Sequence, residues 1–428
     1  MKIIRFGSQE FQRLCHRRTI HLRGGAQRRR QIEERVRRIL EDVRTDGDDA
    51  VLRYTRKFDK VRLTARQLKV TEAETSGAYQ NIEPEFVAAL KLVIENVRAF
   101  YHKQVARSWR RNGEDGIVLG ERCEPLDRVG VYIPAAQAPL VSTVYMTVMP
   151  ARLAGVREIY VTTPPRANGA VDPHILVVAN LLKVAAVYKV GGAQAVGAMA
   201  FGTKTVPRVD KIVGPGNAYV TEAKRQVFGD VDIDMTAGPT EIAVIANQHS
   251  VPEFVAADLE AENEHAQGLG VLITPSRALA RQLRSRVAGG YIVLTRNLGE
   301  AAIAANLVAP EHLEIHVKRP EVLVKKIRHA GAVFLGSYSP ASIGDYVAGP
   351  SHVLPTGGTA RFFSGLGVHD FIRRTSMISY SRKALEKVRG HLERMAMIEG
   401  LTKHMESVKI RFERGHDGAQ KTDGGDSA

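Results

Sequence analysis

Residues 128–163 read RVGVYIPAAQAPLVSTVYMTVMPARLAGVREIYVTT. A short apolar run at each end flanks a longer apolar segment that closes at Gly155, which is typical of a strand, a helix and a second strand. Short apolar runs closed by Gly or Pro recur along the chain as far as GAVFLG, with helical segments between most of them. Strands that alternate with helices predict parallel sheets covered on both faces, so we expect an α/β fold.

The predicted strands fall into two groups, at residues 128–238 and 239–366, which indicates two α/β units and not one long sheet. From Ser381 onward the pattern is helical again. The last residues, GHDGAQKTDGGDSA, are polar and rich in glycine, and this tail is predicted to be disordered.

The 428 residues are 44% hydrophobic and 25% charged, an ordinary globular composition with room for two or three cores. No apolar run approaches the ~20 residues that span a bilayer, and the first residues lack the apolar stretch of a signal peptide. Only two cysteines, Cys15 and Cys123, argue against a disulfide framework. We therefore expect a protein of the reducing cytoplasm.

The formal net charge of +15 favours anionic partners by long-range attraction. In the Arg-rich N-terminal part, however, Ile32, Val36, Ile39 and Val43 follow one another at helical spacing. This pattern predicts an amphipathic helix with a solvated basic face. No zinc-finger, basic-leucine or RNP-like pattern accompanies it, so nucleic-acid binding is kept only as an alternative.

Two glycine-rich segments, VGGAQAVGAMAFGT and IVGPGNAYVTEAK, follow predicted strands and open helices. In open α/β sheets, ligands bind outside the carboxyl ends of strands, and turns of this kind bring backbone N–H groups close to a phosphate. Neither segment has the G-x-G-x-x-G spacing of the ordinary dinucleotide fingerprint. Cofactor binding is therefore only weakly indicated by these turns alone.

The segment PEHLEI places Glu311 and His312 side by side before an apolar alternation. Adjacent side chains point in different directions, so the two cannot both lie in the core on one face. An isolated pair of this kind is more often a polar turn that enters a strand. Other titratable residues decide between the two interpretations.

The segment EAENEHA places Glu262 and His265 three residues apart, and hence on one face of a helix. A carboxylate oxygen and an imidazole nitrogen make half of a divalent-metal site, although such a pair alone is more often a solvated acidic helix. Further titratable residues occur in GDYVAGPSHVLPTGG and EGLTKH, namely Asp345, His352, Glu399 and His404.

These segments occur in one order with TDGDDAVLRYTRKFD, PLDRVGVYIP, VDKIVGPGNAYVTEAK, IDMTAGPTEIAVIA and GDYVAGPSHVLPTGGTARF. Over nearly the whole chain, this series resembles the histidinol dehydrogenase family. The resemblance implies two incomplete Rossmann-like, parallel-sheet units in an aldehyde-dehydrogenase-like arrangement. It also implies helical pieces at both ends, the second of which crosses to the partner in a homodimer with shared active sites.

The domain boundaries implied by the resemblance group two separate stretches into one unit. They are an N-terminal helical piece at 1–26, a first α/β domain at 27–131 and 239–366, a second, cofactor-binding α/β domain at 132–238, and a C-terminal piece at 367–428.

The resemblance also implies a role for each site residue. Glu311 and His312 would be catalytic, with His312 as the general base and Glu311 activating water. One zinc ion per subunit would be held by Glu262, His265, Asp345 and His404. The substrate would be bound by these residues together with Thr240, His352 and Glu399, and NAD by Tyr132, Gln194 and Asn217.

The implied reaction is the oxidation of L-histidinol to L-histidine through bound histidinal, the last step of histidine biosynthesis. It removes two hydrides and uses two NAD molecules in turn. The first half needs a base near neutral pH for the hydroxyl proton, which suits histidine. The second half needs water at the aldehyde, which a neighbouring carboxylate can activate.

The sequence departs from the family pattern at three places. Ala135 and Ala136 stand where the family has two glycines, Glu262 replaces glutamine, and Thr240 replaces serine. One alternative is therefore a paralogous zinc- and NAD-dependent dehydrogenase of another small amino alcohol or diol. Another is covalent catalysis by Cys123, whose acidic neighbours in GERCEPLDR disfavour a thiolate nucleophile.

Overall fold

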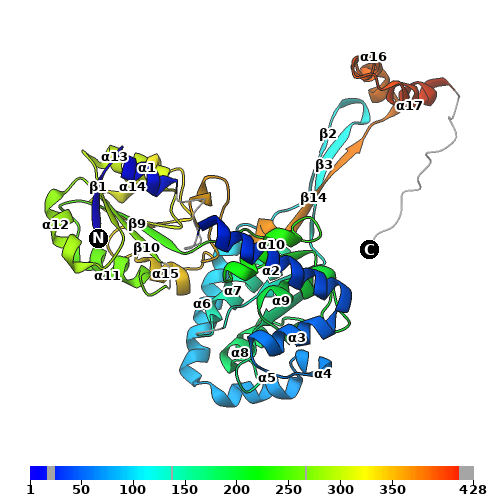
Figure 1. The fold of residues 1–428 in the computed structure, drawn as a ribbon. Helices are drawn as coiled ribbons and strands as arrows, with labels where there is room; N and C mark the ends of the chain where they lie inside the picture. The colour runs from blue at the N-terminus through cyan, green and yellow to red at the C-terminus, as the bar shows by residue number, and fades with distance from the viewer. Residues whose placement is uncertain (17–24, 136–137, 266–267, 414–428) are drawn as a thin grey trace. The chain divides into compact units, whose positions relative to one another are not determined.

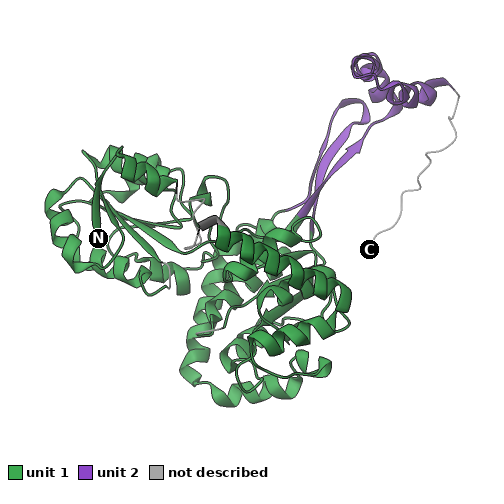
Figure 2. Ribbon diagram, in the orientation of Figure 1, with its two compact units in different colours: residues 1–106, 125–372 green, residues 107–124, 373–428 purple. Residues whose placement is uncertain are grey.

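The computed structural model describes residues 1–16, 25–135, 138–265 and 268–413. Figure 1 shows its helices and strands. The chain divides into two compact units, which are coloured separately in Figure 2. Unit 1 comprises Met1–Ala106 and Pro125–Ile372, and unit 2 comprises Arg107–Glu124 and Arg373–Ala428. The predicted disordered tail and Ala136 lie outside the described residues.

The first sheet of unit 1 has five parallel strands in the order β6-β5-β4-β7-β8. Its strands are β4 (Arg128–Tyr132), β5 (Glu158–Thr163), β6 (Ala186–Lys189), β7 (Lys211–Val213) and β8 (Asp232–Ile233). The helices that follow them are α7 (Val141–Ala154), α8 (Pro173–Leu181), α9 (Gly192–Phe201) and α10 (Ala218–Val227). Each parallel pair is joined through a helix because a tight hairpin cannot connect parallel strands.

The N-terminal helices pack against this five-stranded sheet. Ile32, Val36, Ile39 and Val43 are buried in one cluster with Val196 of α9, which confirms the predicted amphipathic helix. The helices between residue 25 and β4 are α2 (Gly25–Asp46), α3 (Asp48–Phe58), α4 (Ala65–Leu68), α5 (Glu72–Ala78) and α6 (Pro84–His102). Helix α6 lies against α7 and contributes to a second cluster.

The second sheet of unit 1 has six parallel strands in the order β1-β11-β10-β9-β12-β13. Its strands are β1 (Lys2–Arg5), β9 (Glu241–Ala246), β10 (Leu269–Thr274), β11 (Tyr291–Leu294), β12 (His312–His316) and β13 (Ala332–Leu335). Its helices are α1 (Gln9–Cys15), α11 (Pro252–Glu262), α12 (Arg277–Arg286), α13 (Leu298–Val308), α14 (Pro320–Leu323) and α15 (Ala341–Tyr346). Short 3-10 turns elsewhere are Tyr79–Asn81, Glu114–Gly116, Val324–Lys326, Thr359–Arg361 and Val368–Phe371.

The predicted α/β fold with two separate parallel-sheet units is confirmed. The strands predicted within 128–238 form one sheet, and those within 239–366 form the other. The predicted helical piece over residues 1–26 also contains a strand, because β1 pairs with β11 at the edge of the second sheet. The implied domain boundaries remain a prediction. None of the described helices is long and apolar enough to cross a membrane.

Strand β12 has polar and apolar side chains on opposite faces. Leu313 and Ile315 belong to a buried cluster on one face. His312, Glu314 and His316 are in register with residues of β9 that pack toward α11 on the other face, and all three are buried. A fully buried strand with a polar face is unusual, because buried polar groups cost free energy unless they have partners.

Unit 2 is a small sheet with two helices. Its sheet has the order β14-β3-β2, and β2 and β3 are antiparallel. Its elements are β2 (Trp109–Asn112), β3 (Val118–Pro125), β14 (Ile372–Ser379), α16 (Arg382–Ile398) and α17 (Thr402–Glu413).

Candidate active site

Glu311 and His312 lie at the amino end of β12, beside the first residue of β9. Glu311 is buried, and its Oε2 accepts a hydrogen bond from the backbone N–H of Glu241 at 3.2 Å. Burial raises the pKa of Glu311 to about 7, against the lowering effects of His312 and the Thr240 hydroxyl. Near neutral pH this carboxyl group is therefore poised between its protonated and ionised forms.

His312 is enclosed by carboxylates. Its Nε2 lies 3.5 Å from Oδ1 of Asp345, and its Nδ1 lies 3.9 Å from Oε2 of Glu262. Neither ring nitrogen has a partner with hydrogen-bond geometry among the described residues. Burial lowers the pKa of His312, but Asp345, Glu311 and Glu262 together raise it to about 9. Without a bound cation, the ring is therefore an imidazolium at pH 7.

Glu262 is the last residue of α11, and only 5% of it is exposed. Its Oε1 has no hydrogen-bond partner in the described part of the chain. Burial raises the pKa of Glu262, whereas Thr240, His312 and His265 lower it. The backbone N–H of His265 donates a hydrogen bond to the backbone carbonyl oxygen of Glu262 at 3.3 Å. The two predicted ligands therefore lie in the same turn of the chain.

The backbone at Gly268, directly before β10, passes very close to this turn. A Cβ atom at Gly268 would lie 1.9 Å from the backbone oxygen of Glu262, which no side chain tolerates. Glycine at this position therefore allows the backbone to approach the carbonyl oxygen of Glu262 closely. The turn places Glu262 and the exposed His265 at the amino edge of the six-stranded sheet.

His352 and Asp345 enter from the segment after β13. Asp345 lies on α15, and its pKa is lowered because His312, His352 and His265 outweigh the effect of burial. Nε2 of His352 lies 3.0 Å from Oγ of Ser142. Burial lowers the pKa of His352 although Asp345 acts in the opposite direction. His352 is therefore neutral at pH 7 and can donate or accept a hydrogen bond.

A cavity of about 560 Å³ opens onto these side chains. His312, Asp345 and His352 line it together with apolar residues that include Phe334 and Leu354. This volume suits a small organic substrate, since ligand cavities run from ~300 to ~1,000 Å³. The predicted site residues that the structure brings together in unit 1 are Thr240, Glu262, His265, Glu311, His312, Asp345 and His352.

Glu399 and His404 lie in unit 2. Glu399 is the residue directly after α16 and His404 lies on α17, and both side chains are exposed. Their assignment to the substrate and metal site therefore remains a prediction.

The predicted cofactor residues lie at the carboxyl edge of the five-stranded sheet, where the glycine-rich turns were expected to bind a ligand. The hydroxyl of Tyr132, at the end of β4, accepts a hydrogen bond from the N–H of Gly192 at 3.1 Å. Asn217 caps α10 by accepting from two backbone N–H groups, at 3.0 and 3.2 Å. Ala135, which replaces a glycine of the family pattern, packs against the neighbouring core.

Gln194 has an unsatisfied amide. It is 1% exposed, and neither its Oε1 nor its Nε2 has a hydrogen-bond partner among the described residues. A buried primary amide without partners costs free energy that a bound polar ligand can recover. The donor and acceptor of Gln194 thus fit a cofactor at this edge.

The donor types around Glu262 likewise suit a metal ion. Glu262 and Asp345 offer carboxylate oxygens and His265 offers an imidazole, but their ligand atoms do not all lie within 4.8 Å of one another in this structure. One Glu262 oxygen is buried without a partner among the described residues. Oxygen and nitrogen donors of this kind suit a borderline divalent cation. Such an ion would neutralise the two carboxylates and return the pKa of His312 toward its ordinary value.

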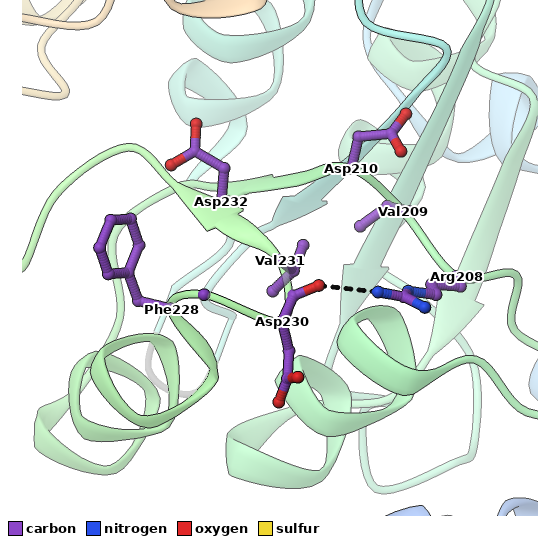
Figure 3. Close-up of a pocket in the computed structure, with 8 residues that line it drawn as sticks. Arg208, Val209, Asp210, Phe228, Asp230, Val231 and Asp232 are labelled. Carbon is purple, nitrogen blue, oxygen red and sulfur yellow. Dashed lines mark hydrogen bonds between the residues drawn. The ribbon is translucent and has the colours of Figure 1, made fainter. Parts of the chain in front are cut away.

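A second hollow, of about 310 Å³, lies beside β7 and β8 and is drawn in Figure 3. Arg208 donates to the backbone oxygen of Asp230 at 2.8 Å. Two carboxylates of the hollow have cationic partners, since Asp230 pairs with Arg44 at 2.7 Å and Asp232 with Lys211 at 2.9 Å. The third, that of Asp210, accepts a hydrogen bond from the backbone N–H of Arg128 at 2.8 Å. None of the predicted site residues lies in this hollow, and we assign no site to it.

The comparisons with known proteins agree on one family. Residues 22–412 match the family model described as histidinol dehydrogenase. Histidinol dehydrogenase of Symbiobacterium thermophilum is 46% identical over 413 residues, which cover 92% of this chain and 94% of the relative. That of Syntrophotalea carbinolica is 45% identical over 400 residues, covering 89% and 93%.

The crystal structure of histidinol dehydrogenase from Elizabethkingia anophelis is similar over 96% of this chain and 98% of its own, with a TM-score of 0.89 and 34% identity. Together, the fold, the buried histidine–carboxylate site and these relatives define an oxidoreductase whose family implies NAD and a metal. The chain belongs to the histidinol dehydrogenase family.

Some buried ionisable groups were not predicted. Glu241, at the start of β9, has a pKa raised to about 7 by burial, and its Oε1 accepts from the N–H of Gly358 at 3.2 Å. Asp258, Glu314 and His316 form a further cluster within unit 1. The signal for the last two was present in HLEIH, where polar residues alternate along a strand that the apolar positions mark as buried.

We expect Cys123→Ala to keep near-normal turnover. Cys123 lies on β3 in unit 2, where its Sγ is 3.7 Å from the backbone oxygen of Arg107 and 3.8 Å from Oε1 of Glu121. These contacts suit a structural thiol that donates its proton. Turnover and metal content of Cys123→Ala should be measured beside those of Cys15→Ala, the other cysteine variant. A folded, metal-loaded Cys123→Ala without activity would revive a thiol mechanism.

Proposed function

We propose that this protein oxidises L-histidinol to L-histidine through bound histidinal, consuming two NAD molecules in turn. The observation that carries the proposal is the adjacent, buried pair Glu311 and His312, of which His312 lines the cavity and lies 3.9 Å from a carboxylate oxygen of Glu262. Relatives that are 45% and 46% identical over nearly their full length bear the name histidinol dehydrogenase. The reaction would be the last step of histidine biosynthesis.

Zinc and NAD would supply what the side chains lack. Zinc, held by Glu262, His265, Asp345 and His404, would anchor the imidazole and amine of the substrate, and NAD, bound at Tyr132, Gln194 and Asn217, would accept the hydride. Thr240, His352 and Glu399 would orient the substrate. Imidazole, amine and carboxylate donors together suit zinc among the divalent cations.

In the first half-reaction, His312 takes the hydroxyl proton as the alcohol carbon loses a hydride. The products are the aldehyde, one NADH and one proton. The base must be neutral to act, so cancellation of the surrounding carboxylate charge by a cation favours catalysis near pH 7. Burial of His312 also shields the reacting atoms from bulk water.

In the second half-reaction, Glu311 takes a proton from water as the water oxygen adds to the aldehyde carbon. The hydrated aldehyde then loses its second hydride, giving the carboxylic acid and a second NADH. A pKa near 7 suits Glu311 to this role, because a general base works best when its pKa is close to the working pH.

We expect Glu311→Gln to slow histidinal oxidation far more than histidinol oxidation, because only the second half-reaction needs activated water. The loss in the second half should be ~10²–10⁴-fold, the usual contribution of a positioned base. In wild type, the rate of that half should rise with pH through about 7 as Glu311 ionises. Stopped-flow NADH formation from each substrate measures both halves, with the exposed Glu321→Gln as control. Equal losses in both halves would contradict the role of Glu311.

We also propose a cytoplasmic homodimer in which the partner's C-terminal piece contributes Glu399 and His404. Support comes from unit 2, where large apolar side chains are exposed on the helices and the adjoining strand, namely Ile378, Met397, Ile398 and Ile410. Exposed apolar groups of this kind are common where two chains associate. Cys15 and Cys123 are not joined by a disulfide, as suits a reducing compartment.

A substrate panel tests histidinol against the paralogue alternative. We expect kcat/KM for L-histidinol to exceed that for small amino alcohols and diols without an imidazole by at least ~10²-fold, because the buried polar groups at the site would otherwise remain unpaired. A simple amino alcohol or diol that outperforms histidinol would show that the substrate is another alcohol.

A further inference from the structure

The polar face of β12 continues beyond the active site. Nε2 of His316 lies 3.0 Å from Oε2 of Glu314 and 3.7 Å from Oδ2 of Asp258. The side chains of His316 and Glu314 are 1% and 0% exposed, and that of Asp258 is 15% exposed. Asp258 lies one helical turn before Glu262 on α11, and His316 lies about 13 Å along β12 from His312.

This cluster places two carboxyl groups beside one imidazole. No Lys or Arg in the described part of the chain lies within ion-pair distance of Asp258 or Glu314, and the basic side chain beside them is that of His316. Burial and the nearby Glu314 raise the pKa of Asp258 to about 7. Nδ1 of the buried His316 also has no partner among the described residues. A bound cation would reduce the repulsion between the buried Glu314 and the largely buried Asp258, in place of the proton that these two carboxyl groups otherwise share.

The spacing of the donors suits coordination. Ligands about 2.0–2.1 Å from a tetrahedral zinc ion lie about 3.3 Å from one another. The two separations at His316, 3.0 and 3.7 Å, lie on either side of that value. The other oxygen of Glu314 accepts the backbone N–H of Ala341 at 2.7 Å, which fixes the carboxylate as outer-shell contacts fix metal ligands.

We propose that Asp258, Glu314 and His316 form a second divalent-cation site, separate from the site at Glu262, His265 and Asp345. Zinc is the ion that this donor set suits best, and the partly exposed side of Asp258 leaves room for a water ligand. The site joins α11, β12 and, through Ala341, the start of α15. These elements carry Glu262, His312 and Asp345, so the second ion would hold the catalytic groups in place.

Metal counting on the full-length protein tests this inference. The protein is loaded with zinc, separated from free ion by gel filtration, and analysed for zinc per chain by mass spectrometry. We expect two zinc ions per chain in wild type, one in His316→Gln and one in Glu262→Ala, which loses only the first site. The exposed His249→Ala serves as the histidine control and should keep two. Zinc should raise the Tm of Glu262→Ala, in which the second site alone remains.

Crystals of the zinc-loaded protein provide a second, independent measurement. Anomalous difference density at the zinc edge should lie between His316 and Asp258 as well as beside Glu262. One ion in wild type together with none in Glu262→Ala would overturn the second site, whether or not His316→Gln folds. Because Glu262→Ala removes the first site, its zinc count reports on the second site alone. If the second site does not exist, this variant binds no zinc, whereas failure of the proposed function alone leaves its count at one.

Discussion

His312→Ala should lower the rate of histidinol oxidation by ~10²–10⁴-fold, the contribution expected of a positioned general base. His312 is buried at the cavity wall, and its ring nitrogens lack hydrogen-bond partners in the described residues, so both are free to act on a substrate. Alanine removes the proton acceptor while leaving β12 paired on both sides through its backbone. The variant should therefore fold and bind substrate but fail at the first proton transfer.

Single-turnover NADH formation measures this effect directly, with His249→Ala as a control at an exposed position. The wild-type rate should increase with pH as His312 loses its proton, and the variant's residual rate should lose that dependence. A variant that keeps at least half of the wild-type rate and the same pH profile would show that another group is the base.

Glu262→Ala should lose both the active-site metal and activity. Glu262 is almost fully buried, and one of its oxygens has no partner among the described residues, so it is placed to serve as a ligand. Alanine leaves no oxygen donor at that corner of the site. The remaining ligands, His265, Asp345 and His404, would hold the ion weakly, because a missing ligand removes a large share of the coordination energy.

Glu262→Gln should behave differently. The amide retains an oxygen donor but removes one negative charge, so metal should be released more readily to a chelator while substantial activity remains. Turnover and the rate of zinc loss to a chelator separate the variants, and the exposed neighbour Glu264→Ala is the control. Full occupancy of the active-site metal and full activity in Glu262→Ala would remove Glu262 from the ligand set.

The roles of the site residues were implied by the resemblance to a family, whereas local spacing drew attention to two pairs of residues. The three-residue interval between Glu262 and His265 predicted one helical face, which is wrong: α11 ends at Glu262, and His265 lies in the turn that follows it. The pair Glu311 and His312 was predicted to precede a strand, and β12 begins at His312. Such features depend on neighbours in the sequence, where helix and strand periodicities are reliable guides.

The edge of the sheet at which the catalytic pair lies was not predicted. The cofactor residues Tyr132 and Asn217 follow the usual rule and lie at the carboxyl ends of parallel strands. His312 instead lies at the amino end of β12. Glu262 reaches the same edge because α11 runs back along the sheet and ends there. This arrangement depends on strand order and helix direction, which local patterns do not determine.

Long-range pairing also explains what the sequence analysis missed. β1 is four residues long, and its place at the sheet edge depends on pairing with β11, nearly 290 residues away. Asp258 lies in what the pattern presented as an ordinary acidic helix, and only the packing of α11 on β12 brings it to His316. Burial of these groups is a property of the tertiary structure.

The ratio of NADH formed to histidinol consumed tests the central claim most directly. The zinc-loaded protein is given limiting L-histidinol and excess NAD, NADH is followed by absorbance, and an aldehyde-trapping reagent is added in parallel. We predict two NADH per histidinol, with histidine as the product and no trapped aldehyde, because Glu311 and His312 serve both oxidations at one buried site. A constant ratio of one, with histidinal recovered in the trap, would contradict the account.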